Sequence, residues 1–405
     1  MRPPTVVLGG GVIGSSIAYH LTLQGASCIV VDERPAGCAS GKAAGFLAAG
    51  WGDRTTDRLH RRSFEMHEQL ASTLKLESYR KLPTISAFRR GDDGWDDGSD
   101  GGQVVDWLDG SDAQHALLDA NTAQVDPAEL SSAMLDAAMA RGAKLLRDEA
   151  VGLALEPLSD EELLDEPAGK RGATRKVTGV ELRDGGTLHA TQVVAAMGPW
   201  TCKLEDWVGV PVPLDGVWST SLVWEGVEAA TSEPAVVFAK QEDEHGCTLE
   251  AYCRPNGDLY VCGCGGSAIV PTDALRAGEV PPKDTDKPKA ARVAAAERSL
   301  RGLSSIGARP SDRQQACMRP CPPDGLPMIG GVPGVRDLFV ATGHNAWGIL
   351  LAPVTGELMA ELLLDGETSL PLQPFSLRRF DTSTYRSLLK FRGRKIGDRA
   401  VGEQW

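Results

Sequence analysis

The sequence of 405 residues lacks the features of a membrane-spanning or nucleic-acid-binding protein. No run approaches the roughly 18 to 20 consecutive apolar residues that a membrane-spanning helix needs, because Gly or Pro interrupts the longest runs. Basic residues are fewer than acidic ones, 42 against 55, and the net charge of -13 repels polyanions. We therefore expect a soluble globular protein with no transmembrane segment and no nucleic-acid partner.

Regular cysteine spacing and a targeting segment are also absent. The nine cysteines are odd in number and scattered over the chain, which argues against a disulfide framework. Cys262 with Cys264, and Cys317 with Cys321, lack the four-ligand spacing of a structural zinc site, so no metal site is predicted. The first strand-like run begins at Thr5, before a signal peptide could fit, and we expect a cytoplasmic protein.

What the sequence does contain begins with a glycine-rich turn. An apolar run at 6–8 precedes the turn, a helical pattern follows it through Leu23, and a second apolar run at 28–31 ends in Asp32 and Glu33. This order predicts a strand, a tight turn, a helix and a second strand.

The turn contains Gly9, Gly11 and Gly14, which form a G-x-G-x-x-G motif in the strand-to-helix context that makes it informative. The first glycine permits the turn, the second lets the backbone approach a pyrophosphate, and the third lets the helix pack against the strand. Asp32 stands where an acid accepts a hydrogen bond from a ribose hydroxyl and disfavours a 2′-phosphate. A glycine turn without a ligand is the alternative, and the turn alone does not separate FAD from NAD.

Nucleotide-domain patterns recur in the middle and at the end of the chain, separated by strand-rich stretches. The clearest helix starts at Asp126-Pro127 with a capping Asp and stops at Gly142. Strands are expected at 144–146, 151–155, 177–182 and 187–195 and within 210–270, with a turn at 184–186. Helices are expected at 289–303 and at 349–364, and the second of these is predicted to be amphipathic. Solvated insertions are expected at 91–102 and 156–175. The pattern predicts two interleaved domains.

Several ordered blocks together resemble the D-amino acid oxidase (DAO) superfamily of FAD-dependent oxidoreductases, in the pattern of the glycine and sarcosine oxidases. The blocks are the amino-terminal unit, 40–45, 193–200, 319–320 with 324–330, and 341–353. Segments 252–263 and 40–42 look more like an uncharacterised eukaryotic branch that includes a yeast FAD-dependent amine oxidoreductase-like protein. The likeness spans nearly the whole chain, to Phe380.

The resemblance implies an α/β fold in which a Rossmann-like FAD-binding domain is interleaved with an antiparallel-sheet substrate domain. The expected boundaries are 1–80, 125–210 and 310–380 for the FAD-binding domain, 81–124 and 211–309 for the substrate domain, and 381–405 for a basic C-terminal tail. The implied cofactor-binding residues are Gly9, Gly11, Val12, Ile13, Gly14, Asp32, Glu33, Ser40, Gly41, Lys42, Ala43, Ala44, Gly45, Val151, Gly198, Trp200, Gly343, Trp347, Gly348, Ile349 and Leu350.

The helix expected near Gly348 has a physical rationale of its own. Its first turn presents unpaired N–H groups and a partial positive charge, which would stabilise the negative charge that a flavin gains on reduction. An ordinary helix bounded by glycines is the alternative.

Three positions depart from the family pattern. Cys317 stands where the glycine-oxidase pattern has glycine, and it matches the cysteine that attaches the flavin covalently in sarcosine oxidase; a buried thiol that only packs is the alternative. Ala346 and Leu350 stand where relatives place the cation that anchors a substrate carboxylate, which argues against a simple amino acid bound in the usual way. The candidates for the flavin and substrate surroundings are Arg319, His344, Tyr252, Arg254 and Trp347, with Lys42 as a further cation.

The leading functional hypothesis is an FAD-dependent oxidase or dehydrogenase that oxidises the C–N bond of a small amine or amino acid by hydride transfer to flavin N5. An FAD-binding interaction or trafficking protein with little activity is the alternative, and an NAD-dependent dehydrogenase is a third. For the basic tail, contact with a protein partner or an anionic membrane is one interpretation, and folding back onto the acidic surface or hanging free is the favoured alternative.

Overall fold

The glycine-rich start of the chain forms the predicted unit in the computed structural model, which describes residues 4–89, 105–111, 113–164 and 172–380. Strand β1 (Thr5–Leu8) leads into helix α1 (Val12–Leu23), and β2 (Cys28–Val31) returns parallel to β1 with Thr5 opposite Cys28. The short apolar strands are covered on both faces, as strands of a parallel sheet must be.

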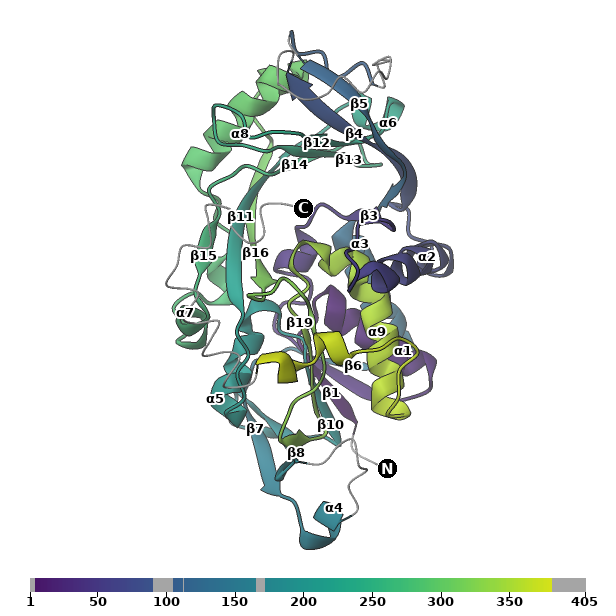
Figure 1. The fold of residues 1–405 in the computed structure, drawn as a ribbon, viewed down its shortest axis with the longest axis vertical. Helices are drawn as coiled ribbons and strands as arrows, with labels where there is room; N and C mark the ends of the chain where they lie inside the picture. The colour runs from purple at the N-terminus through teal and green to yellow at the C-terminus, as the bar shows by residue number, and fades with distance from the viewer. Residues whose placement is uncertain (1–3, 90–104, 112, 165–171, 381–405) are drawn as a thin grey trace.

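These strands belong to a six-stranded sheet whose order is β17-β19-β10-β1-β2-β6. All its neighbours are parallel except β17 and β19. The other strands are β6 (Lys144–Leu146), β10 (Gln192–Ala195), β17 (Met328–Gly331) and β19 (Leu338–Thr342). The sheet therefore draws on the start, middle and end of the chain, which confirms the predicted interleaving (Figure 1).

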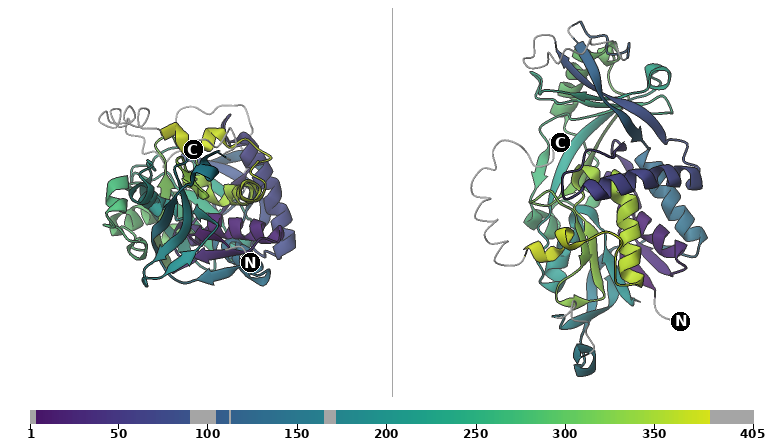
Figure 2. Two further views of the ribbon diagram at one scale, coloured as in Figure 1. Left: turned by 90° about the horizontal axis from the view of Figure 1, so that it is seen from below. Right: turned by 45° about the vertical axis from the view of Figure 1, so that its right-hand side comes forward.

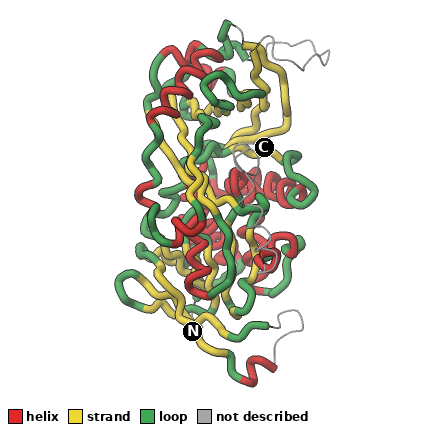
Figure 3. The backbone as a smooth tube through the Cα atoms, turned by 60° about the vertical axis from the view of Figure 1, so that its left-hand side comes forward, coloured by secondary structure: helices red, strands yellow, loops and turns green. Residues whose placement is uncertain are grey.

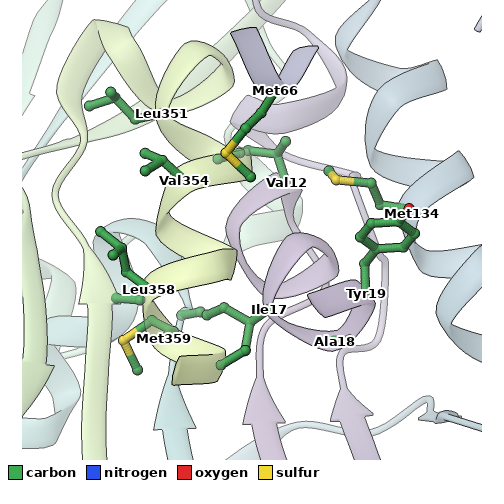
Figure 4. Packing of buried hydrophobic residues seen from close by; sticks show 14 of the residues in the cluster. Val12, Ile17, Ala18, Tyr19, Met66, Met134, Leu351, Val354, Leu358 and Met359 are labelled. Atoms are coloured by element: carbon green, nitrogen blue, oxygen red, sulfur yellow. The ribbon is translucent and has the colours of Figure 1, made fainter. Parts of the chain in front are cut away.

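Four helices pack together beside this sheet. They are α1, α2 (Asp57–Leu74), α3 (Pro127–Ala140) and α9 (Gly348–Leu364). Figure 2 shows α9 in yellow-green against α2 in dark blue and α1 in purple, and Figure 4 shows buried side chains of this helix core, among them Ile17 of α1, Met66 of α2 and Leu358 of α9. Their burial removes apolar surface from water, which is the main favourable contribution to folding.

Helix α3 begins as predicted, whereas α2 and α9 differ from expectation. The Asp126 carboxylate accepts hydrogen bonds from the N–H groups of Ala128 and Glu129, at 2.9 and 3.0 Å. Helix α2 is absent from the sequence-based prediction. Helix α9 is not amphipathic, because it is buried on nearly all sides between the sheet and the other helices. The segment 345–364 is long and apolar enough to cross a membrane, but 67% of it is buried here, as in the core helix of a globular domain.

A nine-stranded sheet forms the second domain, in the order β15-β11-β14-β13-β12-β4-β5-β3, with β16 also paired to β11. The pairs are antiparallel apart from β12 with β4. Its strands are β3 (Phe46–Ala48), β4 (Arg80–Arg89), β5 (Ala113–Gln124), β11 (Asp215–Trp224), β12 (Val236–Ala239), β13 (Glu250–Cys253), β14 (Leu259–Cys262), β15 (Ala268–Val270) and β16 (Arg313–Cys321). Helix α8 (Ala290–Leu303) covers its outer face.

The predicted domain boundaries and the sheets disagree at two places. Strands β3 and β16 pair with β5 and β11, so 46–48 and 313–321 contribute to the antiparallel sheet rather than to the parallel one. Both strands carry cavity-lining residues, and through them the two domains share one site.

Smaller elements complete the fold. A third sheet consists of β7 (Ala150–Pro157), β8 (Arg175–Leu182), β9 (Thr187–His189) and β18 (Val335–Arg336), and the short helices are α4 (Asp160–Leu164), α5 (Leu204–Val208), α6 (Ala229–Ser232) and α7 (Thr272–Arg276). The turn predicted at 184–186 joins β8 and β9, with Gly185 at a φ of +89°. Figure 3 shows strands at both ends of the long axis, with several helices between them. The predicted insertion at 91–102 lies outside the described residues, as do 165–171 of the second insertion and the tail 381–405.

Candidate active site

A cavity of about 950 Å³ lies between the parallel and the antiparallel sheets. It extends from the glycine turn past the start of α9 to the inner face of the nine-stranded sheet. Sequence-predicted residues that line it are Gly9, Gly11, Val12, Ile13, Asp32, Glu33, Ser40, Ala43, Ala44, Gly45, Gly198, Trp200, Tyr252, Cys317, Arg319, His344, Trp347, Gly348 and Ile349. The fold thus brings together residues that are more than 300 positions apart.

The glycine turn is shaped by backbone contacts that leave no room for side chains. Gly9 has a φ of +101°, and a Cβ there would lie 2.4 Å from the Ala196 carbonyl oxygen. A Cβ at Gly14 would lie 1.8 Å from the Gly9 carbonyl oxygen, which is the close packing expected of the third glycine. The Val12 N–H at the start of α1 donates to the Ser40 hydroxyl oxygen at 2.9 Å, so Ser40 lies directly at this helix terminus.

The acids after β2 have different partners. The Asp32 carboxylate accepts from the N–H groups of Gly10 and Arg34, both at 2.6 Å, and so holds the turn against the end of β2. Glu33 is exposed and pairs with Arg183 at 3.1 Å. Both acids line the cavity, and the two backbone bonds to Asp32 leave lone pairs on its oxygens that a ribose hydroxyl can use.

Seven predicted residues lie outside the cavity lining, namely Gly14, Gly41, Lys42, Val151, Arg254, Gly343 and Leu350. Leu350 is 1% exposed and belongs to the helix core. Val151 is 46% exposed, while its neighbour Ala150 lines the cavity. The Leu350 side chain thus contacts the core and the Val151 side chain contacts solvent, whereas the contact that the resemblance implies for Val151 is through its backbone.

Arg254 and Lys42 were candidates for a substrate-binding cation, but the structure gives both of them protein partners. Arg254 pairs with Asp126 at 3.1 Å, donates to the Ala43 carbonyl at 3.2 Å and lies over the Tyr260 ring. The Lys42 ammonium pairs with Asp286 and donates to the Ala316 carbonyl. The Arg254 contacts connect the end of β13 with the start of α3 and with the loop before β3, and the Lys42 contacts connect that loop with β16 and with Asp286.

The start of α9 borders the cavity through Trp347, Gly348 and Ile349. Gly343, the residue directly after β19, has a φ of +76° and a Cβ there would meet the Pro322 ring, so the turn requires glycine. His344 also lines the cavity, and burial lowers its pKa to about 3, so its ring is neutral at physiological pH. Its Nε2 lies 3.0 Å from the Thr355 hydroxyl oxygen.

The inner face of the nine-stranded sheet supplies the opposite side of the cavity. Glu250 and Tyr252, two residues apart on β13, both line it, and the Tyr252 hydroxyl donates to Glu250 Oε2 at 2.6 Å. Cys262, opposite Glu250 on β14, donates to the same oxygen at 3.3 Å. The sequence analysis did not predict Glu250 as a site residue. Because alternate residues of a strand lie on the same face, its position two residues before the candidate Tyr252 could have indicated it.

Two further predicted residues come from β16. Cys317 lines the cavity and burial raises the pKa of its thiol, which disfavours the thiolate. Arg319 also lines the cavity, and its Nη1 donates to the Ser219 hydroxyl oxygen at 3.0 Å. Arg319 thus remains a candidate for contact with a ligand.

The residues present fit an extended dinucleotide such as FAD. A helix N-terminus, a side-chain-free glycine turn and Asp32 lie at one end, which suits a pyrophosphate and a ribose. The volume is at the upper end of the roughly 300 to 1,000 Å³ of ligand pockets, and aromatic and apolar groups line the other end. Within the described residues no group of three or more His, Cys, Asp or Glu is arranged to hold a metal ion.

The parallel-sheet domain, the glycine turn and the sheet-covered cavity define a two-domain dinucleotide-binding protein. The chain belongs to the DAO family, described as FAD dependent oxidoreductase, whose family model matches residues 5–362. The family assignment confirms the sequence-based resemblance, and with it the FAD cofactor.

Individual relatives agree with this assignment. The putative oxidoreductase C1F5.03c of Schizosaccharomyces pombe is 26% identical over 404 residues, covering 89% of this chain and 94% of that protein. The putative oxidoreductase TDA3 of Saccharomyces cerevisiae is 33% identical over 187 residues, which cover 44% of this chain and only 32% of the yeast protein.

A solved relative shares the fold. The glycine oxidase of Geobacillus kaustophilus is 26% identical over 412 residues, covering 93% of this chain and 97% of that protein. Its crystal structure matches with a TM-score of 0.72, 22% identity in the structural alignment, and coverage of 93% and 98% of the two chains. The match confirms the predicted two-domain α/β architecture.

Proposed function

We propose that this FAD-dependent oxidoreductase oxidises a C–N bond of a small amine or amino acid. The observation that carries the proposal is the cavity, which joins the dinucleotide turn to a sheet face bearing Glu250, Tyr252 and Arg319. The oxidase activities in the names of full-length relatives, glycine oxidases among them, support this class of reaction. FAD, when bound, supplies the group that accepts a hydride from the substrate carbon.

The chain's own residues bind, orient and exclude water. The rings of Phe46, Tyr252 and Trp347 exclude water from the sheet-side end of the cavity, and Glu250 and Arg319 provide charges that orient a polar substrate. The neutral His344 ring is held near the start of α9 by Thr355. No described side chain is required to act as an acid or base in this scheme.

Anaerobic mixing tests the proposal. The FAD-loaded protein is mixed with primary amines, N-methyl amino acids and D-amino acids, and the visible absorbance of the flavin is followed. Bleaching by one group of substrates is the expected result. If no compound bleaches the flavin of protein that retains FAD, the result would favour the interaction or trafficking role predicted as the alternative, which the family comparison does not favour.

The cytoplasmic location stays a prediction that cell fractionation checks.

A further inference from the structure

The carboxylate of Glu250 lies at the sheet-side end of the cavity. Glu250 Oε2 accepts from the Tyr252 hydroxyl at 2.6 Å and from the Cys262 thiol at 3.3 Å. These two donors fix the carboxylate on the cavity-facing side of β13. A negative charge held there repels an anionic group and attracts a cationic one.

Aromatic rings border the same part of the cavity. The Phe46 ring centroid lies 6.2 Å from that of Tyr252 and 6.4 Å from that of Trp347, and all three residues line the cavity. Aromatic faces attract ammonium groups through their quadrupoles and also bury attached alkyl groups. A carboxylate beside such rings is therefore suited to an alkylammonium group.

The positions that would anchor a carboxylate carry no charge in this chain. Ala346 lines the cavity without a polar side chain, and Leu350 is 1% exposed inside the helix core. Arg319 faces the cavity, but its Nη1 donates to Ser219, whose hydroxyl lies 2.8 Å from that of Ser267. Ser219 and Ser267 line the cavity as well, so this hydrogen bond already engages one nitrogen of the guanidinium at the cavity wall.

We propose that Glu250, framed by the Phe46, Tyr252 and Trp347 rings, is the binding site for the substrate's ammonium group, and that the substrate class is amines without a carboxylate on the reacting carbon. The proposal rests on the proposed function, because it takes the sheet-side end of the cavity as the substrate site. Glu250 acts here as a substrate-binding residue.

A binding experiment with FAD-loaded protein tests the assignment without turnover. Butylamine and N-methylbutylamine serve as cationic probes, and glycine and sarcosine as probes that carry a carboxylate; the shift of the visible flavin spectrum gives the Kd. Glu250→Gln is expected to weaken both cationic probes at least ten-fold, since it removes a charge-assisted contact. Glu367→Gln, the same change at an exposed position after α9, is the matched control and should leave both values within two-fold.

Two results would overturn the proposal. One is unchanged cation binding in Glu250→Gln. The other is tighter binding of glycine or sarcosine than of the amines, lost in Arg319→Gln and retained in Glu250→Gln. If Glu250→Gln does not retain FAD, Tyr252→Phe keeps the ring and removes the 2.6 Å bond, and it should weaken the cationic probes at least three-fold.

The same protein separates this proposal from the proposed function. If amines bind through Glu250 but no compound bleaches the flavin, the C–N oxidation fails and the cation site stands. If sarcosine or glycine bleaches the flavin through Arg319, the oxidation stands and the cation site fails.

Discussion

The two ends of the cavity are built in different ways. At the glycine-turn end, the shape comes from backbone atoms, because Gly9 and Gly14 have no space for a Cβ and Asp32 binds two backbone N–H groups. At the sheet end, side chains such as Glu250 and Tyr252 provide the surface. The glycine-turn end is therefore specialised for one fixed cofactor. At the sheet end, by contrast, side-chain substitutions can change which substrate binds.

Replacing Gly14 by Val should have the largest effect. The added Cβ would lie 1.8 Å from the Gly9 carbonyl oxygen, so α1 must move away from β1. We expect destabilisation of more than about 4 kcal/mol and no retained FAD. Flavin absorbance per protein after gel filtration and thermal unfolding measure both effects. Gly50→Ala, where an added Cβ meets nothing within 4 Å, should behave like the unmodified protein, and retained FAD in Gly14→Val would show that the turn is not rigid.

Mild acid should destabilise the region around α9. Burial lowers the pKa of His67 and His344 to about 4 and about 3, so the unfolded chain binds protons at these sites first as the pH falls below about 6.5. Their stabilisation is complete above that pH and is lost progressively toward the folded-state values. Between pH 7.5 and 5.0 we expect a loss of about 2 kcal/mol for each histidine, measured by urea unfolding.

The control for this pH effect is His189→Gln, at an exposed position on β9, which should leave the slope unchanged. A stability that stays constant between the two pH values would contradict the neutral, buried state of the two histidines.

Asp32→Asn probes the glycine-turn end alone. The variant loses the charge that strengthens the two 2.6 Å bonds to Gly10 and Arg34. Because hydrogen bonds to charged groups contribute about 1.5 to 3 kcal/mol, we expect FAD affinity to fall about ten- to hundred-fold. Fluorescence titration of FAD-free protein measures it. Glu33→Gln, at the exposed neighbour, should change affinity less than about three-fold, and equal effects in the two variants would refute the special role of Asp32.

Two ion pairs allow the stabilising effect of a contact between the domains to be compared with that of a pair on the surface. Arg254 and Asp126 form a pair with side chains 12% and 27% exposed, whereas Arg61 and Asp57 are 61% and 37% exposed. Arg254→Ala should therefore lower the free energy of unfolding by about 2 kcal/mol, whereas Arg61→Ala, which removes a solvent-exposed pair, should leave it nearly unchanged. Urea unfolding measures both values. Equal values would show that Arg254 does not connect the domains.

Cys317 offers the smallest expected effect. Because burial raises the pKa of its thiol, we expect the residue to stay unmodified and the flavin to remain non-covalent. Precipitation of the loaded protein with acid should leave the yellow colour in the supernatant, with Cys317→Ser as the control. Colour that stays with the pellet, and is released in the serine variant, would establish the covalent linkage.

The glycine-turn end could be predicted from sequence because its requirements are local. Gly9, Gly14 and Asp32 act through backbone geometry within one strand–turn–helix–strand unit, and the Asp126 cap of α3 is equally local. The partners of Arg254 and Lys42 could not be predicted, because both residues are paired across long sequence separations with Asp126 and Asp286.

The sheet end was harder to predict for a related reason. Assigning β3 and β16 to the antiparallel sheet depends on pairing between distant strands, and the position of Glu250 depends on the register of β13 with β14. The sequence pattern predicted that helix α9 is amphipathic, but neighbouring elements also cover its polar positions.

A crystal structure of the protein grown with saturating FAD tests the central statement most directly. The account predicts a single extended dinucleotide whose pyrophosphate lies at the start of α1, whose ribose lies beside Asp32 and whose ring lies between the start of α9 and the face that carries Glu250. A cavity filled by rearranged side chains, or FAD bound elsewhere, would contradict it.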